Sequence, residues 1–180
     1  MNLRVISEKR PGRGAARARG FKEAKGDIIL SADADTIFYK GWVEKLTTAI
    51  KDDVVAVTTS CKIADSHPIK NAIFNLTHPF WMRLYRMVAG HFWLCGFSFG
   101  ILKSVYQKSG GFNVSLQAQE DVDLSFRVAK YGKIKFINKP VIFSGRRYKE
   151  GLLAGYYEYV KSFITVFLFK DKKVYLDNPR

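Results

Sequence analysis

The sequence has few cysteines and no leader-like apolar segment near its start. Its two cysteines, Cys61 and Cys95, are far apart and belong to no Cys-x-x-Cys or Cys/His cluster. This excludes a disulfide framework and gives no zinc motif. The residues after Met1 are basic and Gly-rich and lack the apolar core of a secretory signal. We therefore expect a reducing, cytoplasmic setting.

The longest apolar region, Leu152 to Phe169, is interrupted by Glu158 and Lys161. It falls short of the roughly 20 apolar residues that a membrane-spanning helix requires. Apolar residues recur there every three or four positions, as in an amphipathic helix, namely Leu152, Tyr156, Val160, Phe163 and Phe167. Lysines 170, 172 and 173 follow. Such a helix either packs on its own domain or makes peripheral contact with an anionic membrane face, here the cytoplasmic one.

Acidic residues are scarce relative to basic ones. The chain has sixteen Asp and Glu residues and thirty Lys and Arg residues, which gives a formal charge of +14. This excess of positive charge predicts a polyanionic partner. A nucleic-acid-binding module is one candidate, with a phosphate-tracking stripe formed by Arg10, Arg13, Arg17 and Arg19. The sequence has no base-reading motif, so nucleic acid ranks below a phosphorylated small molecule or an anionic lipid.

The apolar content of 47% over 180 residues predicts one packed domain of the α/β class. We expect strands over residues 3–7, 27–31, 54–59, 134–137 and 141–143. We expect helices over residues 15–25, 42–50, 69–88, 102–109 and 120–129, the third interrupted or kinked near Pro79. The strand, helix and strand between residues 27 and 59 predict a parallel crossover.

Asp33-Ala34-Asp35 lies just past the carboxyl end of the strand at residues 27–31. Two carboxylates at such an edge suit a divalent cation, because ligands of open α/β sheets bind there. The spacing alone is weak, since Asp121-Val122-Asp123 repeats it and solvated surface acids explain most such pairs. The surrounding motifs decide between the two readings.

Four motifs occur in a fixed order: Gly14–Gly20, Gly26–Asp35, Gly110-Gly111-Phe112-Asn113 and Glu120-Asp121. This set resembles the family 2 glycosyltransferases of the GT-A fold, over about Arg4 to Arg147. The resemblance implies a Rossmann-like, mostly parallel sheet flanked by helices. It also implies an inverting transferase that uses a nucleotide-sugar donor and Mg²⁺ or Mn²⁺.

By resemblance, Asp35 would bind the metal directly and Asp33 would reach the nucleotide ribose or a metal-bound water. Asp121 would be the base that deprotonates the acceptor hydroxyl, and Glu120 would orient the acceptor. Without the family context, Glu120, Asp121 and Asp123 simply complement a helix dipole.

Gly96 to Gly100 occupies the place where relatives form the acceptor side of the cleft. Gly96, Phe97 and Phe99 would then border the acceptor, or the segment is a buried strand. Many relatives have a metal-binding histidine after the last strand, where this chain has Arg146 and Arg147. These arginines are candidates for binding the donor phosphates, or they are surface charges. His67, His78 and His91 show no ligand spacing.

Relatives begin with a strand, a helix and a second strand that hold the nucleotide base, and this chain begins after them. The resemblance thus implies an N-terminally truncated domain, with residues 1–150 as the C-terminal portion of the catalytic domain and residues 151–180 as a helix and tail. The acceptor is a glycan, a polysaccharide or a lipid-linked molecule. The alternative is a truncated, inactive relative that acts as a binding module.

Overall fold

The structure is a computed structural model that describes residues 3–148 and 151–169, without the side chain of Arg147. Strands and helices alternate along most of the chain, as the sequence predicts. The elements are α1 (Arg13–Glu23), β1 (Ile28–Ala32), α2 (Trp42–Thr47), β2 (Val54–Ile63), α3 (Pro68–Ala89), β3 (Ser98–Leu102), α4 (Lys103–Lys108), α5 (Glu120–Val128), β4 (Lys133–Phe143), the short 3₁₀ helix η1 (Arg146–Tyr148) and α6 (Leu152–Phe167).

The four strands form one sheet in the order β1-β3-β2-β4. β3 is antiparallel to both β1 and β2, whereas β2 and β4 are parallel. Three of the four strands therefore run in one direction, and β3 alone runs against them. β1 and β2 are parallel in direction, as expected, but they are not hydrogen-bonded neighbours, because β3 lies between them. The sheet is thus mixed: of its three hydrogen-bonded strand pairs, only the pair of β2 and β4 is parallel.

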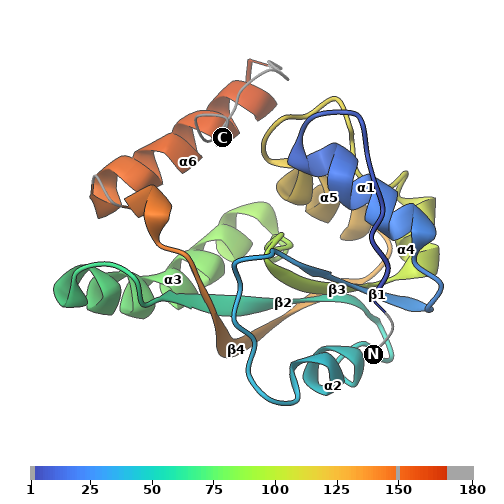
Figure 1. The fold of residues 1–180 in the computed structure, drawn as a ribbon, viewed down its shortest axis with the longest axis horizontal. Helices are drawn as coiled ribbons and strands as arrows, with labels where there is room; N and C mark the ends of the chain where they lie inside the picture. Colours follow the sequence, from blue (N-terminus) through green and yellow to red (C-terminus); the bar gives the residue numbers. More distant parts are fainter. Residues whose placement is uncertain (1–2, 149–150, 170–180) are drawn as a thin grey trace.

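Helices cover both faces of the sheet (Figure 1). α2 packs on one face, where Trp42 and Leu46 join a cluster that contains Val57. α1, α3, α4 and α5 lie on the other, and Phe21 and Met82 pack there with Phe99 of β3. α6 lies above α3, farther from the sheet (Figure 1). This α/β architecture confirms the predicted fold class.

Two local predictions are wrong. Residues 3–7 form no strand: they pair with no other strand, and Leu3 and Val5 are exposed. Residues 133–143 form one strand, because β4 stays paired with β2 across an irregularity after Thr59. Of the two alternatives for Pro79, the interruption is also wrong, because α3 continues through this residue as one helix of 22 residues, and the kink stays a prediction.

α3 and α6 carry much of the exposed apolar surface. On α3 it follows a helical stripe of Ile69, Ile73, Leu76 and Phe80, and on α6 it follows one of Leu153, Tyr157, Val160 and Ile164. The opposite side of α6 faces the protein, because Tyr156 and Tyr159 pack against the core. Within residues 3–148 and 151–169, no helix is both long and apolar enough to cross a membrane.

Candidate active site

One edge of the sheet gathers the predicted site residues. β1, β2 and β4 all end at this edge, and the antiparallel β3 begins there, with Ser98 paired to Ala32. Asp33 and Asp35 follow β1, and Gly96 and Phe97 precede β3. Arg146 follows β4. The strand directions alone therefore bring together segments that are far apart in the sequence.

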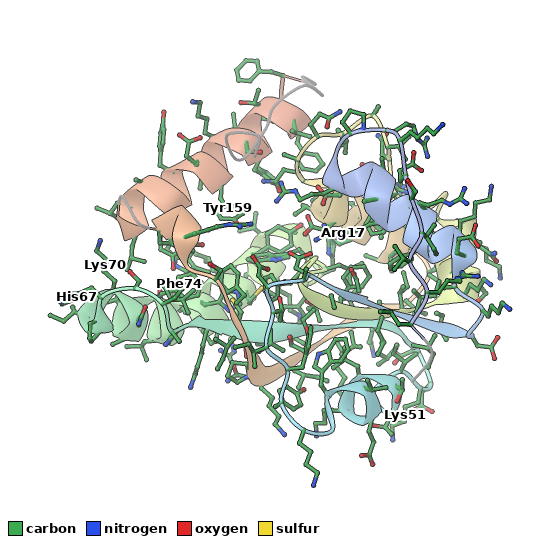
Figure 2. The ribbon with its side chains drawn as sticks, viewed as in Figure 1. Arg17, Lys51, His67, Lys70, Phe74 and Tyr159 are labelled. Carbon is green, nitrogen blue, oxygen red and sulfur yellow. The ribbon has the colours of Figure 1, made fainter. Side chains whose placement is uncertain are left out.

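Arg17 connects Asp33, after β1, with Glu120, at the start of α5. It lies on α1, with its guanidinium facing the site (Figure 2). Its Nη2 donates to Asp33 Oδ1 at 2.5 Å, and its Nη1 donates to Glu120 Oε1. The close approach requires glycine at position 96, since a Cβ there would lie 2.5 Å from the guanidinium.

Glu120 and Arg17 form a buried ion pair, with side-chain exposures of 3% and 13%. Burial alone would lower the pKa of Arg17, but the three surrounding carboxylates raise it, so the guanidinium stays charged. Burial and the charge of Asp121 raise the pKa of Glu120, and Arg17 partly offsets this rise. Glu120 is therefore a carboxylate whose charge depends on its arginine partner.

Asp121 is held by backbone groups at the first turn of α5. Its Oδ2 accepts from Gly96 N and its Oδ1 accepts from Val122 N, both at 2.9 Å. A carboxylate has about four lone-pair positions, so each oxygen can accept a further hydrogen bond. The contact with Gly96 fixes α5 against the start of β3.

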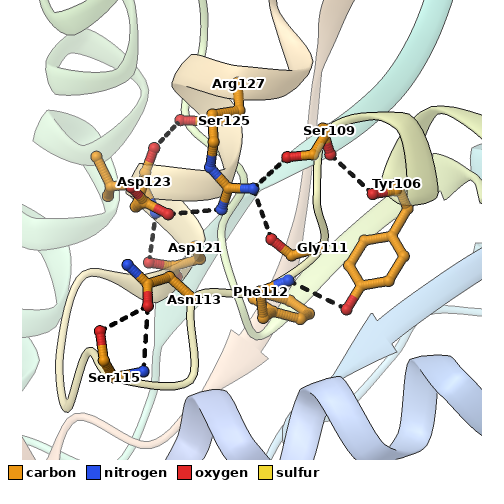
Figure 3. Close-up of polar contacts among 11 residues, drawn as sticks. Tyr106, Ser109, Gly111, Phe112, Asn113, Ser115, Asp121, Asp123, Ser125 and Arg127 are labelled. Atoms are coloured by element: carbon orange, nitrogen blue, oxygen red, sulfur yellow. Dashed lines mark hydrogen bonds and ion pairs between the residues drawn. The ribbon is translucent and has the colours of Figure 1, made fainter.

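Asp123 does not share the site, although it repeats the Asp-x-Asp spacing. It pairs at 2.5 Å with Arg127, one turn along α5 (Figure 3). The same guanidinium donates to the carbonyls of Ser109 and Gly111, in the turn after α4. The Gly-Gly-Phe turn thus supports α5 from outside the site.

Arg146 lies 3.5 Å from Asp35 Oδ2, and both side chains are about two-fifths exposed. The loop before it is anchored by Asp65, which accepts from Gly145 N at 2.6 Å and from the Ser144 hydroxyl at 2.8 Å. Arg146 therefore lies beside Asp35. The side chain of Arg147, the other predicted phosphate ligand, lies outside the described residues.

A cavity of about 680 Å³ connects these groups. Asp33, Asp35, Glu120, Asp121 and the arginines Arg13, Arg17 and Arg146 line its polar part. Gly96 and Phe97 line it too, and Phe97 stacks on Phe143 with centroids 5.2 Å apart. Phe99, by contrast, is fully buried in β3, so it does not border the cavity.

The rest of the cavity is apolar and lies between α3 and α6. Phe74, Trp81 and Val88 of α3 line it from one side, and Tyr159 and Phe163 of α6 line it from the other. Figure 2 shows Tyr159 and Phe74 on the same side of the sheet as Arg17. The acids thus lie at one end of a long, largely aromatic cavity.

Asp33 and Asp35 fit a divalent cation that takes ligands from its substrate. Their side chains are 40% and 39% exposed. Among the described residues, no group of three or more His, Cys, Asp or Glu side chains could hold a metal. Mg²⁺ commonly binds one or two carboxylates together with phosphate oxygens and water, so two accessible carboxylates are a suitable protein contribution.

The sequence interpretation missed Arg17 as a site residue and named it only in the lower-ranked nucleic-acid stripe. In the structure the Arg17 side chain is 13% exposed and pairs with Asp33 and Glu120, while Arg10 and Arg19 pair with Glu8 and Glu23, so all three guanidinium groups already have carboxylate partners. The available signal was the position of Arg17 inside the Gly14–Gly20 motif. His78, which the sequence offers only as a core or surface histidine, is buried in the cavity wall.

Comparison with known proteins agrees with this geometry. The profile of "Glycosyl transferase family 2" matches residues 1–110. The uncharacterized glycosyltransferase YwdF of Bacillus subtilis (strain 168) is 34% identical over 76 residues, which are 39% of this chain and 28% of that protein. Glu120 and Asp121 lie beyond the region that the profile matches.

Solved structures resemble the fold at low sequence identity. The mannosyltransferase PcManGT from Pyrobaculum calidifontis, in complex with GDP-Man and Mn²⁺, is 18% identical with a TM-score of 0.53. Glucosyl-3-phosphoglycerate synthase from Mycobacterium tuberculosis, in complex with Mn²⁺, UDP and glucosyl-3-phosphoglycerate, is 17% identical with a TM-score of 0.56. The matches cover 87% and 88% of this chain but only 46% and 56% of those chains.

Proposed function

Because the chain belongs to glycosyl transferase family 2, we propose that it transfers a sugar from a nucleotide-diphosphate donor to an acceptor hydroxyl, with inversion at the anomeric carbon. The observation that carries this proposal is the meeting of four carboxylates and three arginines in one cavity at the carboxyl edge of the sheet. Cations beside a cavity suit a diphosphate, and a fixed carboxylate suits proton removal.

The proposed step is a single displacement. The acceptor hydroxyl gives its proton to Asp121 while its oxygen bonds to the anomeric carbon. The bond from that carbon to the donor phosphate breaks, and the nucleoside diphosphate leaves with the electron pair. Attack from the face opposite the leaving group inverts the configuration. Two backbone N–H groups orient the Asp121 carboxylate for this role.

Asp33 and Asp35 would hold Mg²⁺ or Mn²⁺ together with the donor phosphates. The cation would offset the negative charge that develops on the departing diphosphate. Asp35 is the better placed of the two, because Arg17 already engages Asp33 at 2.5 Å, whereas Arg146 contacts Asp35 at 3.5 Å. Arg146 would bind the same diphosphate, with Arg147 as a further candidate.

Gly96 and Phe97 would border the acceptor, and the buried Glu120 would orient it. Arg17 would hold Glu120 and Asp33 in place, so that the two halves of the site keep a constant separation. The acceptor classes that fit this proposal are a glycan, a polysaccharide and a lipid-linked molecule.

Titration calorimetry of UDP and of GDP with Mn²⁺ tests the donor site. We expect saturable binding that depends on the metal and that Asp35→Ala weakens by about tenfold or more, which corresponds to about 1.4 kcal/mol. Asp53→Ala is the matched control, since Asp53 pairs with Lys133 before β2, outside the cavity. Equal affinities for Asp35→Ala and the unaltered protein would contradict the proposal.

Measuring nucleotide binding and sugar transfer separately distinguishes an active transferase from an inactive relative that only binds nucleotide. If the protein binds nucleotide but transfers no sugar to any acceptor, it is an inactive relative that acts as a binding module. If Asp121→Asn abolishes transfer while nucleotide binding persists, Asp121 is the base.

We also propose a cytoplasmic protein that makes peripheral contact with an anionic membrane surface. α3 contains Lys70, Arg83 and Arg86 but no acidic residue, and its outer stripe is apolar. An exposed apolar stripe flanked by basic residues is typical of interfacial helices. α6 adds a second exposed stripe beside it.

A further inference from the structure

The apolar half of the cavity extends away from the acids of the site. It extends from Asp121 between α3 and α6, and aromatic side chains form most of its wall. Apart from the tyrosine hydroxyls and His78, the side chains of this half are apolar, which suits a hydrocarbon chain. The apolar half is continuous with the carboxylates, so one molecule can occupy both.

His78 gives a second, independent sign of a ligand in this half. The side chain is 8% exposed, lines the cavity, and its Nδ1 has no hydrogen-bond partner. Burial lowers the pKa of His78 to about 4, so the imidazole is neutral at neutral pH. A buried polar atom without a partner is costly unless a ligand satisfies it. A neutral imidazole suits a hydroxyl, ester or amide group.

We infer that the acceptor is a long-chain lipid, whose apolar chain lies between α3 and α6 and whose hydroxyl reaches Asp121. This inference rests on the proposed transferase function. The lipid hydroxyl loses its proton to Asp121 as its oxygen bonds to the anomeric carbon. The bond from that carbon to the donor phosphate breaks, and the nucleoside diphosphate leaves with the electron pair.

The surroundings of the cavity suit a substrate that comes from a bilayer. The two helices that form the apolar half, α3 and α6, are also the two that carry exposed apolar stripes. Trp81, Val88 and Val160 line the cavity and are 42%, 85% and 57% exposed, so apolar side chains reach from its interior to the surface of the protein. Thr77 Oγ1 and Tyr156 Oη lie 3.1 Å apart and join the two helices.

Tryptophan fluorescence tests the inference without any donor. The probe is a dodecanol brominated at its far end, because bromine quenches tryptophan on contact. Trp93 lines the cavity, whereas Trp42 lies on α2 and does not. One variant keeps only Trp93, through Trp42→Phe and Trp81→Phe, and the other keeps only Trp42. We expect saturable quenching of Trp93 and little quenching of Trp42.

A pair of charge variants repeats the test in a chain that keeps all its tryptophans. Val160 lines the cavity and is 57% exposed, while Val43 on α2 is 56% exposed. We expect Val160→Glu to weaken binding of the alcohol by about tenfold and Val43→Glu to leave it unchanged. Equal quenching of the two tryptophans, or equal affinities in the two charge variants, would overturn the inference.

Nucleotide binding, measured separately by calorimetry, distinguishes the two proposals. A protein that binds the alcohol but no nucleotide would refute the transferase function and leave the apolar ligand site. A protein that binds nucleotide but not the alcohol would refute the lipid acceptor alone.

Discussion

At the scale of single residues, Arg17 provides the positive charge that lets neighbouring carboxylates of the site stay ionised. Glu120 is almost fully buried next to Asp121, and two neighbouring carboxylates in an apolar setting disfavour each other's charge. The guanidinium pairs with Glu120 and Asp33 together, so it balances charge on both sides of the site. The arrangement of Asp33, Glu120 and Asp121 therefore depends on the position of the Arg17 guanidinium.

Replacing Arg17 by Met should destabilise the protein by about 3 kcal/mol, because a buried charge loses its partner. The loss should depend on pH. The pKa of Glu120 is already raised, and it rises further without Arg17. A carboxyl whose folded pKa is raised contributes stability below its unfolded pKa and loses it as pH rises. Urea denaturation should show a deficit, relative to the unaltered protein, that grows as pH rises above the raised pKa that Glu120 has in that protein.

The matched control is the double variant Arg17→Met/Glu120→Gln. It removes the buried charge together with its partner, so its stability deficit should be smaller and nearly independent of pH between about 5 and 8. A deficit in Arg17→Met that stays constant over this range would mean that Glu120 is not the group left uncompensated.

At the scale of elements, the sequence predicted most helices and strands, because their apolar patterns are local. It could not predict that β3 lies between β1 and β2, since this order depends on contacts between distant segments. Residues 3–7 have a strand-like composition but no partner strand, and composition alone does not reveal this. Pro79 is tolerated because packing of α3 outweighs one lost backbone bond.

The Gly-Gly-Phe turn supports α5, the helix that carries Asp121, from the end of the helix opposite to Asp121. Arg127 donates to Gly111 O at 2.6 Å and pairs with Asp123 (Figure 3). Gly111 has φ +66°, and a Cβ there would lie 2.9 Å from Tyr106 Oη, so the turn depends on glycine. This turn therefore holds the C-terminal end of α5 through Arg127.

We expect Arg127→Met to lower the free energy of unfolding by about 1–3 kcal/mol, because two carbonyls lose a charged donor. Sugar transfer should fall further than nucleotide affinity, since α5 carries Asp121 but not Asp35. Urea denaturation and calorimetry measure the two effects. Asp123→Asn, which keeps Arg127, should cost less stability than Arg127→Met. If both variants lose equally, the ion pair and not the turn contacts fixes α5.

At the scale of the whole molecule, the sequence named the acids that the fold gathers in the cavity but not the arginine that joins them. Asp33, Asp35, Glu120 and Asp121 belong to short motifs that can be recognised locally. Arg17 lies 16 residues from Asp33 and 103 from Glu120, so only the folded chain reveals its role. The apolar half of the cavity escaped prediction for the same reason, since α3 and α6 meet only in the fold.

The net charge of +14 and the two exposed apolar stripes predict that the protein binds anionic membranes in a salt-dependent way. The protein should co-sediment with phosphatidylglycerol vesicles at about 0.1 M salt and much less at about 1 M, where the Debye length falls to about 3 Å. Leu76→Glu, on the α3 stripe, should weaken binding by about tenfold, because burying a leucine is worth about 1.5–3 kcal/mol.

Two controls separate this contact from general adhesion of a basic protein. Val43→Glu makes the same charge change on the opposite face of the sheet, so it should leave vesicle binding nearly unchanged. Phosphatidylcholine vesicles should bind weakly, because they lack the anionic charge that attracts basic side chains. If Leu76→Glu and Val43→Glu weaken binding equally, charge alone drives adsorption, and the stripes of α3 and α6 must be covered by something other than lipid.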